Sequence, residues 1–498
     1  MCRDDAATRQ KSRRNIVNAF AQKSNVGGRI CRAANQHPDR DAIIAADIRL
    51  SYGKLAKIGK AFALNLRAIG ATQETTIAIH SRDMIASVAV MIATSLIGAR
   101  LVIYSRRDEL SDDDTIILYS PDQAKPVDGR ATLIPANWSP RYTKIPDDAD
   151  LGFLGYRDPE DTWWTIHTSG TTGRPKALGL SHRVAYDRSI AVNGDFRGAD
   201  TRFCSMFPCN VRPFLVRAMA ALSNGSTIVD TMDPAFMDAE GVNLISASPR
   251  QVLGWLEDYN PKMRFPKLQV SGAPLRPKAV ATLLRTFETV QDVYGSGETN
   301  KSFVNQWSMQ GGTAVVAGVP QDTDVEIVDA KGVPCPTDVV GDVRMRNSYM
   351  CDGYVDAPEA TARAFRAGWF YPGDLGQWTV RGALQILGRA DQVINLGGTK
   401  VDPLEVEDVL LCVPNVIEAA VFLDPIEQSP PRTMAFLRVA SGCDLADTVK
   451  TAVTLCEKQL GGAKAPGYVF VVPEIPMTND GVPRREDCAR MAKSLPRQ

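Results

Sequence analysis

The chain has 498 residues, which is too long for one hydrophobic core, so we expect two or more domains. Its 57 basic residues balance its 57 acidic residues without a long run of like charge, which argues against nucleic acid or a membrane as partner and favours small molecules. The ten cysteines form no C-x-x-C pair, a pattern typical of reduced cysteines in a cytoplasmic protein.

The first half of the chain alternates helical and strand patterns. Residues 52–70 carry apolar side chains near helical spacing and end at a glycine, so we expect a helix there. A strand pattern follows at 75–80, then an apolar helix from Ala86 and a second strand pattern at 99–104. Polar residues interrupt this apolar region, which favours a core helix and strand over a membrane span. The alternation predicts an α/β fold with a parallel or mixed sheet covered by helices on both faces.

A loop rich in glycine, serine and threonine follows a predicted strand at 162–167. Its sequence, TSGTTGRPK, offers hydroxyl and backbone N–H groups that can surround an anion, and Lys176 adds a positive charge. Ligands bind at strand ends in parallel α/β sheets, so a phosphate is the expected guest. The loop is not a Walker A motif, because Pro175 stands where glycine should precede the lysine. A surface linker is the alternative interpretation.

The second half of the chain has a different pattern. Residues 323–347 alternate apolar and polar side chains around turn residues, which predicts hairpins of a smaller β-rich subdomain. A patterned helix at 403–414 and a strand at 417–423 indicate a compact α+β tail. The predicted organisation is a large N-terminal domain over 1–388, a hinge at 389–391 and a small C-terminal domain over 392–498.

Four further motifs follow the loop in order: VSGAPL at 270–275, VYGSGET at 293–299, GYVDAPEATARAFRAGWFYPGDLGQW at 353–378, and LGRADQVINLGGTKVDPLEVEDVLLCVPNVIEAAVF at 387–422. With TSGTTGRPK they resemble the motifs of the adenylate-forming superfamily, which includes acyl-CoA synthetases, adenylation domains of peptide synthetases and luciferases. The similarity extends over roughly residues 40 to 490. The resemblance implies that the C-terminal domain is mobile.

The resemblance also implies a role for each matching residue. The phosphates of ATP would be surrounded by Thr168, Ser169, Gly170, Thr171, Thr172, Gly173 and Lys176. The adenine would lie along Gly272, Ala273 and Pro274, with Tyr294 stacked on its other face beside Gly295 and Ser296. Glu298 would hold Mg²⁺, Asp374 with Arg389 would bind the ribose, Asp391 would be the hinge, and Lys400 would act in the second step.

The implied reaction is attack of a carboxylate on the α-phosphate of ATP, giving an acyl-adenylate and pyrophosphate. Both reactants are anionic, so the site must supply positive charge and alignment. The acyl group would then pass to a thiol of CoA or of a carrier-protein phosphopantetheine. We therefore expect an acid–thiol ligase that acts on a small carboxylic acid, aryl and amino acids included. We expect no carrier-protein domain after residue 498, so a carrier protein would be a separate chain.

The C-terminal motif departs from the family pattern. That pattern, P-x-T-x-x-G-K-x-x-R, corresponds to PMTNDGVPRRE at 476–486, where Val482 takes the place of the lysine. Loss of one preorganised donor costs on the order of 100- to 1000-fold in rate. Two smaller departures are Gly297, where a hydroxyl residue is expected, and Pro372, where a threonine is usual.

Three functions remain open after this comparison of motifs. The first is a working ligase in which Arg484, Arg485 or Lys464 replaces the missing charge. The second is a specialised relative that uses ATP for a non-thioester ligation or another unusual activation. The third is a nucleotide-binding pseudoenzyme.

The identity of the acid depends on the segment at 203–222, which is expected to border the acyl pocket. This segment lacks the histidine or aromatic residue often found there. Arg212 and Arg217, with Asn210 close by, could recognise a second carboxylate or a polar aryl group. We favour the simpler expectation that Arg212 and Arg217 are solvated side chains on a helix.

Overall fold

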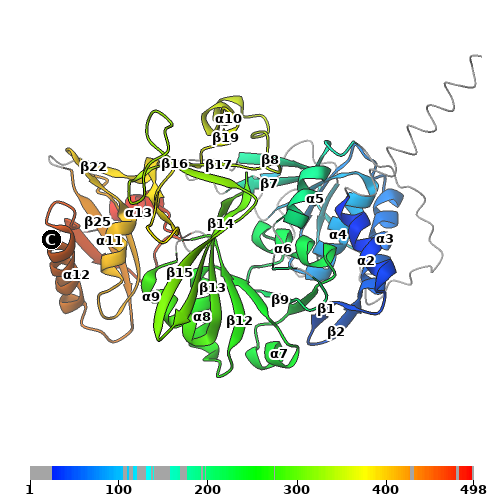
Figure 1. Cartoon of the computed structure of the whole chain (residues 1–498), viewed down its shortest axis with the longest axis horizontal. Helices are drawn as coiled ribbons and strands as arrows, with labels where there is room; N and C mark the ends of the chain where they lie inside the picture. The colour runs from blue at the N-terminus through cyan, green and yellow to red at the C-terminus, as the bar shows by residue number, and fades with distance from the viewer. Residues whose placement is uncertain are drawn as a thin grey trace, which may run out of the picture.

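The computed structural model of the protein describes residues 25–104, 109–110, 116–120, 130–135, 138, 158–168, 176–191, 195–196, 198–273, 275–426, 431–477 and 482–495. Two sheets with their helices form the N-terminal part, a third sheet follows, and the C-terminal part lies at one end of the molecule (Figure 1). Among the described residues, no helix combines the length and apolar character that a membrane crossing requires.

The first sheet has six strands in the order β6-β5-β3-β4-β7-β8. Its neighbours run parallel except β7 and β8, which run antiparallel. The strands are β3 (Thr76–His80), β4 (Arg100–Ile103), β5 (Ile116–Tyr119), β6 (Thr132–Leu133), β7 (Thr162–Thr168) and β8 (Lys176–Ser181). The strands expected at 75–80, 99–104 and 162–167 are therefore present.

The second sheet has nine strands in the order β15-β14-β13-β12-β11-β9-β10-β1-β2. Its middle is parallel, and β2, β14 and β15 join antiparallel at the two edges. The strands are β1 (Asp41–Ala45), β2 (Ile48–Ser51), β9 (Arg202–Ser205), β10 (Thr227–Asp230), β11 (Leu244–Ala247), β12 (Phe265–Val270), β13 (Phe287–Ser296), β14 (Asn300–Gln310) and β15 (Thr313–Pro320). The mixed sheet agrees with the predicted fold class.

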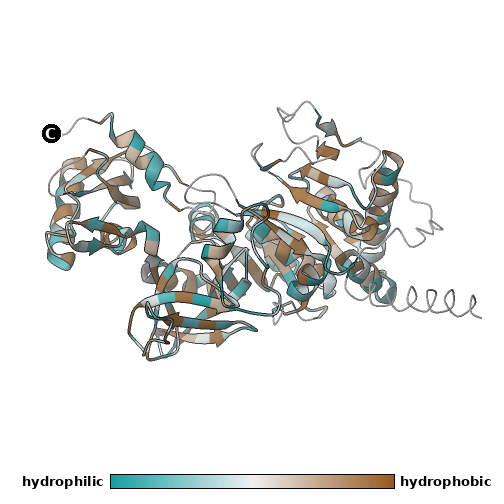
Figure 2. Cartoon of the chain, turned by 90° about the horizontal axis from the view of Figure 1, so that it is seen from above, coloured by the Kyte–Doolittle hydropathy of each residue, from teal (hydrophilic) through white to brown (hydrophobic). Residues whose placement is uncertain are grey.

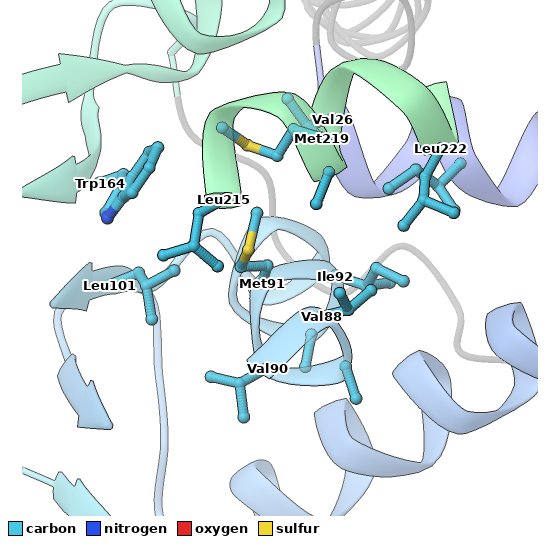
Figure 3. Close-up of a cluster of buried hydrophobic side chains, with 14 of the residues drawn as sticks. Val26, Val88, Val90, Met91, Ile92, Leu101, Trp164, Leu215, Met219 and Leu222 are labelled. Carbon is cyan, nitrogen blue, oxygen red and sulfur yellow. The ribbon is translucent and has the colours of Figure 1, made fainter. Parts of the chain in front are cut away.

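One hydrophobic cluster joins the helices between residues 26 and 223 to strands of both sheets, and a second cluster holds the three later helices against the nine-stranded sheet. Figure 3 shows the centre of the first cluster, where side chains of α4 and α6 meet Trp164 and Leu101. The helix α4 begins where Asp83 accepts hydrogen bonds from the backbone N–H groups of Ile85 and Ala86. The helices of this part are α2 (Val26–Gln36), α3 (Tyr52–Ala68), α4 (Met84–Ile97), α5 (His182–Ala191), α6 (Arg212–Ser223), α7 (Pro234–Ala239), α8 (Pro249–Tyr259) and α9 (Pro277–Thr286).

The expected β-rich subdomain is a third sheet, in the order β18-β19-β17-β20-β21 with β16 paired to β17. Its hairpin of β16 and β17 is antiparallel, as the alternating pattern at 323–347 predicts. The elements are β16 (Asp324–Val328), β17 (Gly341–Arg346), α10 (Pro358–Ala364), β18 (Phe365–Arg366), β19 (Trp369–Phe370), β20 (Asp374–Trp378) and β21 (Leu384–Arg389).

The C-terminal part is built on a three-stranded sheet, β24-β25-β26, with a separate hydrophobic cluster on each face. In Figure 2 its strands are largely brown, and teal residues lie on the outer helices. Its elements are η3 (Ala390–Gln392), β22 (Ile394–Leu396), β23 (Thr399–Val401), α11 (Pro403–Leu410), β24 (Val416–Leu423), β25 (Thr433–Val439), α12 (Leu445–Leu460), β26 (Tyr468–Val471) and α13 (Arg485–Ala492). The helix α11 is shorter than the expected 403–414, because Pro414 disfavours helical backbone at the residue before it.

Candidate functional site

The glycine-rich loop joins β7 to β8, and its two ends lie side by side because Thr168 pairs with Lys176 across the hairpin. Ser169, Gly170, Thr171, Thr172 and Gly173 lie outside the described residues. The strands on either side of the loop are therefore antiparallel neighbours in an otherwise parallel sheet. The helix α5 begins only after β8, at His182.

Lys176 lies close to a tyrosine that the sequence analysis did not single out. Its Nζ atom is 4.9 Å from the centre of the Tyr354 ring, a cation–π contact. The Tyr354 hydroxyl donates a 2.7 Å hydrogen bond to Oε1 of Glu298. Burial and the negative charge of Glu298 raise the pKa of the Tyr354 phenol, so the hydroxyl stays protonated and available as a donor. Tyr354 thus connects the predicted phosphate-binding lysine to the predicted metal ligand.

Glu298 is held inside the turn between β13 and β14. The Ser296 hydroxyl accepts hydrogen bonds from the backbone N–H groups of Glu298 and Thr299, at 3.2 and 3.3 Å. Gly295 is required at the start of this turn, since a Cβ atom there would collide with the backbone carbonyl of Asn300. The turn leaves Glu298 only 6% exposed.

The carboxylate of Glu298 fits a hard cation. In the described part of the chain, a hydrogen bond reaches only its Oε1 atom, so Oε2 can serve as a ligand. A buried carboxylate is costly without a compensating partner, and carboxylate oxygens are ligands that Mg²⁺ prefers.

Arg188 of α5 fixes the backbone on both sides of Glu298. Its guanidinium is buried and donates to the carbonyl oxygens of Tyr349 at 2.9 Å, Gly297 at 2.9 Å and Glu298 at 2.7 Å. The helix that follows the phosphate-loop hairpin is thereby tied to the predicted metal ligand. No sequence signal identified this residue.

The predicted ribose-binding residues Asp374 and Arg389 form one connected cluster with Tyr294, the residue predicted to stack on the adenine. The Tyr294 hydroxyl donates a 2.6 Å hydrogen bond to Oδ2 of Asp374. Arg389 places its Nη1 atom 3.7 Å from Oδ1 of Asp374 and donates to both carboxylate oxygens of Asp391, at 2.9 and 3.0 Å. Burial raises the pKa of Asp374, while the Arg389 hydrogen bonds lower the pKa of Asp391.

The predicted adenine loop follows β12, next to the strand that carries Tyr294. The strands β12 and β13 run parallel with Val270 opposite Asp292, so the loop and Tyr294 leave the same edge of the sheet. Gly272 has a φ of +95°, a backbone conformation that favours glycine. Gly272 and Ala273 are described, whereas Pro274 lies outside the described residues.

Residues 30–355 match the family model of the AMP-binding enzyme, and residues 405–481 match that of the AMP-binding enzyme C-terminal domain. The chain belongs to the AMP-binding enzyme family. The expected membership of the adenylate-forming superfamily, with its fold and its AMP-forming, synthetase-like enzyme class, is confirmed.

One relative and two solved structures of similar fold match this chain over more than nine tenths of its length. It is 25% identical to a probable CoA ligase of Humulus lupulus, over 93% of this chain and 95% of the relative. The O-succinylbenzoate coenzyme A synthetase of Bacillus subtilis, in complex with ATP and magnesium ion, has a TM-score of 0.78 at 21% identity, covering 92% and 98% of the chains. The amide bond synthetase of Marinactinospora thermotolerans has a TM-score of 0.77 at 22% identity, covering 94% and 99%.

Lys400 of this AMP-binding enzyme lies apart from the clusters above. It is exposed on β23, opposite Asn395 in the hairpin with β22. Within the residues that the structure covers, no hydrogen bond or ion pair joins Lys400 to Lys176, Glu298 or Asp374. The structure therefore joins Lys176 to Glu298 through Tyr354, and Tyr294 and Arg389 to Asp374, but it does not bring Lys400 to either group.

Val482 is half-buried, beside the bridge between Met477 and Pro483. The cations proposed to replace the charge of the expected lysine are largely engaged in ion pairs. Arg485 contacts Oε1 of Glu407 at 2.7 Å, and Lys464 contacts Oε2 of Glu405 at 2.7 Å. Arg484 is exposed, and its Nη1 atom lies 4.0 Å from Oδ2 of Asp487.

Proposed function

We propose that this protein is an ATP-dependent ligase that activates a small carboxylic acid as an acyl-adenylate and transfers the acyl group to a thiol of CoA or carrier-protein phosphopantetheine. The observation that carries the proposal is a pair of side-chain clusters close enough for the charge of Glu298 in one to act on Asp374 in the other. Lys176, Tyr354 and Glu298 form one cluster, and Tyr294, Asp374 and Arg389 form the other. A basic residue and a carboxylate suit phosphate and Mg²⁺, while a second carboxylate beside an aromatic ring suits a nucleoside.

In this proposal the nucleotide is held along its whole length. The loop of Thr168, Ser169, Gly170, Thr171, Thr172 and Gly173, with Lys176, surrounds the phosphates. The adenine lies between Tyr294 and the loop of Gly272, Ala273 and Pro274, and Asp374 accepts hydrogen bonds from the ribose hydroxyls. Bound Mg²⁺, held by Glu298, would neutralise part of the phosphate charge.

The first step joins an oxygen of the acid's carboxylate to the α-phosphorus of ATP, and the bond from that phosphorus to the β-phosphate oxygen breaks. Pyrophosphate leaves with the electron pair of that bond. Because both reactants are anionic, Lys176 contributes by offsetting their repulsion and by fixing the phosphates in line for attack. Tyr354 holds the Glu298 carboxylate in place during this step.

The second step requires rotation of the C-terminal part about Asp391. We propose the hinge at 389–391, where β21 ends and η3 begins. The rotation would bring Lys400 and the acceptor thiol to the adenylate, and the sulfur would then replace AMP on the acyl carbon.

A second candidate is ligation of the adenylate to a nucleophile other than a thiol. The half-buried Val482, in the position of the family's lysine, favours a site altered for unusual chemistry. This candidate shares the first step with the main proposal and differs only in the acceptor.

The test follows pyrophosphate release from ATP and Mg²⁺ with a panel of carboxylic acids, each with and without CoA. Mass spectrometry should find an AMP adduct of the acid without CoA and a thioester with CoA. Asp374→Asn, which removes the ribose-binding charge, should lower both products. Failure of ATP to bind with Mg²⁺ present would contradict every enzyme function proposed here, and an AMP adduct without a thioester would favour the second candidate.

A further inference from the structure

A layer of charged side chains lies against the nine-stranded sheet, beside the predicted adenine loop. On β12, Leu268 and Val270 point into one hydrophobic cluster, whereas the alternating residues Lys267 and Gln269 face the opposite side. Gln269 is only 3% exposed, so this second face is buried although it is polar.

The layer contains one carboxylate that two lysines share. Asp195 contacts Lys267 Nζ at 2.8 Å and Lys301 Nζ at 3.0 Å, and the side chains of Asp195 and Lys301 are each 9% exposed. The single negative charge of Asp195 offsets only one of the two lysine charges, so the three side chains together keep a net positive charge.

Arg217 of α6 adds a further positive charge to the same layer. It is half-buried and donates to the carbonyl oxygen of Pro213 at 2.9 Å and to the Ser271 hydroxyl at 3.1 Å. These acceptors are neutral, and among the described residues no ion pair joins Arg217 to a carboxylate. Burial and the positive charge of Arg212 lower the pKa of Arg217 to about 10. The expectation of solvated arginines on this helix is therefore wrong for Arg217.

The position of Arg217 relates it to the nucleotide site. Ser271 immediately precedes the adenine-loop residue Gly272, and Lys301 follows Glu298 by three residues. The positive charges of Arg217 and Lys301 act on each other electrostatically, so they share one region of the interior. The carboxylate of Asp195 also acts on Arg217 electrostatically, but it is already shared by Lys267 and Lys301. Buried charges are costly unless they are paired, and a bound anion would supply further negative charge.

We propose that the acid activated by this protein carries a second carboxylate, which Arg217 binds, with Lys301 adding positive charge behind it. This inference rests on the proposed function. A guanidinium donates in a planar fork that matches a carboxylate, which distinguishes Arg217 from the lysines of the layer.

The test compares each diacid with its monomethyl ester, which keeps the shape and removes one charge. Isophthalate and adipate are paired with their monoesters, and kcat/KM is measured by ATP–pyrophosphate exchange. We expect the wild type to prefer the diacid, and Arg217→Gln to lower kcat/KM for the diacid by about ten- to a hundredfold while changing the monoester by less than about twofold. Arg217→Lys, which keeps the charge and loses the fork, should give an intermediate loss and covers the case in which Arg217→Gln fails to fold.

The matched control is Ser271→Ala, which removes the hydrogen bond between Arg217 and the adenine loop but keeps the charge. A purely structural role of Arg217 predicts that Arg217→Gln and Ser271→Ala both raise KM for ATP and lower the rates with diacid and monoester equally. That result, or a wild-type preference for the monoesters, would overturn the inference.

Binding of isophthalate, measured by calorimetry with AMP present, separates the inference from the proposed function. Diacid binding that Arg217→Gln abolishes, without an AMP adduct from any acid, would refute the proposed function and support the anion site. The opposite outcome is that the protein turns over monoacids while the wild type and Arg217→Gln bind the diacid equally well. That outcome would support the proposed function and overturn the inference.

Discussion

At the scale of single residues, the motif comparison predicts a lysine at the position of Val482, and two of the cations proposed to replace it are engaged with glutamates. Arg485 is paired with Glu407, and Lys464 is paired with Glu405. If the protein is a slow carboxylate ligase, a lysine at this position restores a donor to the developing charge. We predict that Val482→Lys raises the rate of pyrophosphate release by about tenfold or more, since loss of such a donor costs on the order of 100- to 1000-fold.

The control for Val482→Lys is Val482→Met, which lengthens the side chain without adding charge and should leave the rate near that of the wild type. Both variants are compared at saturating ATP and acid. An unchanged or slower rate in the lysine variant would argue against a slow ligase.

Arg188 supports a second prediction at this scale. Arg188→Gln leaves buried carbonyl groups near Glu298 without donors, so we expect a loss of about 3 kcal/mol in the free energy of unfolding. The Mg²⁺ concentration for half-maximal pyrophosphate release should also rise, because Glu298 loses its backbone support. Urea unfolding and a Mg²⁺ titration measure the two effects.

The matched control is Arg183→Gln on the same helix. Arg183 pairs with Glu160 and Asp187 at the surface, and exposed pairs contribute little, so the loss should stay below about 1 kcal/mol. Equal effects of the two substitutions would contradict a special role for Arg188.

The sequence motifs singled out Lys176, Glu298 and Asp374 by their residue types, and each contacts another polar or aromatic side chain in the structure. Their roles in nucleotide binding stay predictions. Tyr354 and Arg188 were missed because their contacts join segments far apart in the chain, 56 residues for Tyr354 and Glu298 and 110 residues for Arg188 and Glu298, which one sequence cannot reveal. The burial of Arg217 was not predicted, because the spacing of apolar residues does not reveal that α6 is buried on nearly every side.

At the scale of elements, periodicity predicted α3, α4, β3 and β24 well. These segments have uniform patterns, and their ends carry a cap such as Asp83 or a turn glycine such as Gly98. The hairpin of β7 and β8 was not predicted, since the strand after the glycine-rich loop could equally have been the start of a helix. The predicted domain limits at 389–391 stay a prediction.

The start of α5 carries a pH-sensitive residue, His182. Its ring stacks on Trp163 with centres 5.7 Å apart, and burial lowers its pKa to about 4. Between this value and the ordinary value near 6.5, the unfolded chain binds a proton that the folded chain does not. Stability is therefore retained above about pH 6.5 and lost as the pH falls toward 4.

We predict that the titration of His182 lowers the free energy of unfolding by about 2 kcal/mol when the pH falls from 7 to 5. His182→Phe keeps a stacked ring and should remove this part of the acid sensitivity, as judged by urea unfolding at both pH values. His37→Gln, at an exposed position, is the control that should retain it. The same pH dependence in wild type and His182→Phe would count against the assignment.

At the scale of the whole molecule, a buried carboxylate connects the N-terminal and C-terminal parts. Glu407 of α11 is 1% exposed and lies 3.5 Å from Arg276 at the start of α9 and 2.7 Å from Arg485 of α13. Arg276 also donates to the carbonyl oxygen of Leu404 at 3.2 Å and pairs with Asp408. This contact holds the two parts in the arrangement described here.

We predict that Glu407→Gln loosens this arrangement, because breaking a buried ion pair typically costs about 3–5 kcal/mol. Trypsin should then cleave after Arg389, at the proposed hinge, several times faster than in the wild type. Glu405→Gln removes a carboxylate from the more exposed pair with Lys464 and serves as the control. Equal cleavage rates in the two variants would show that Glu407 does not control access to the hinge.

Arg389 contacts both the predicted ribose site and the proposed hinge. Its guanidinium lies near Asp374 of the ribose site and forms an ion pair with Asp391 of the hinge. On the proposed function, nucleotide affinity and domain rotation therefore cannot be tuned separately through this residue. An engineer who varies residues 389–391 to change the acceptor would alter retention of AMP at the same time, so variants of the hinge should be selected on both properties together.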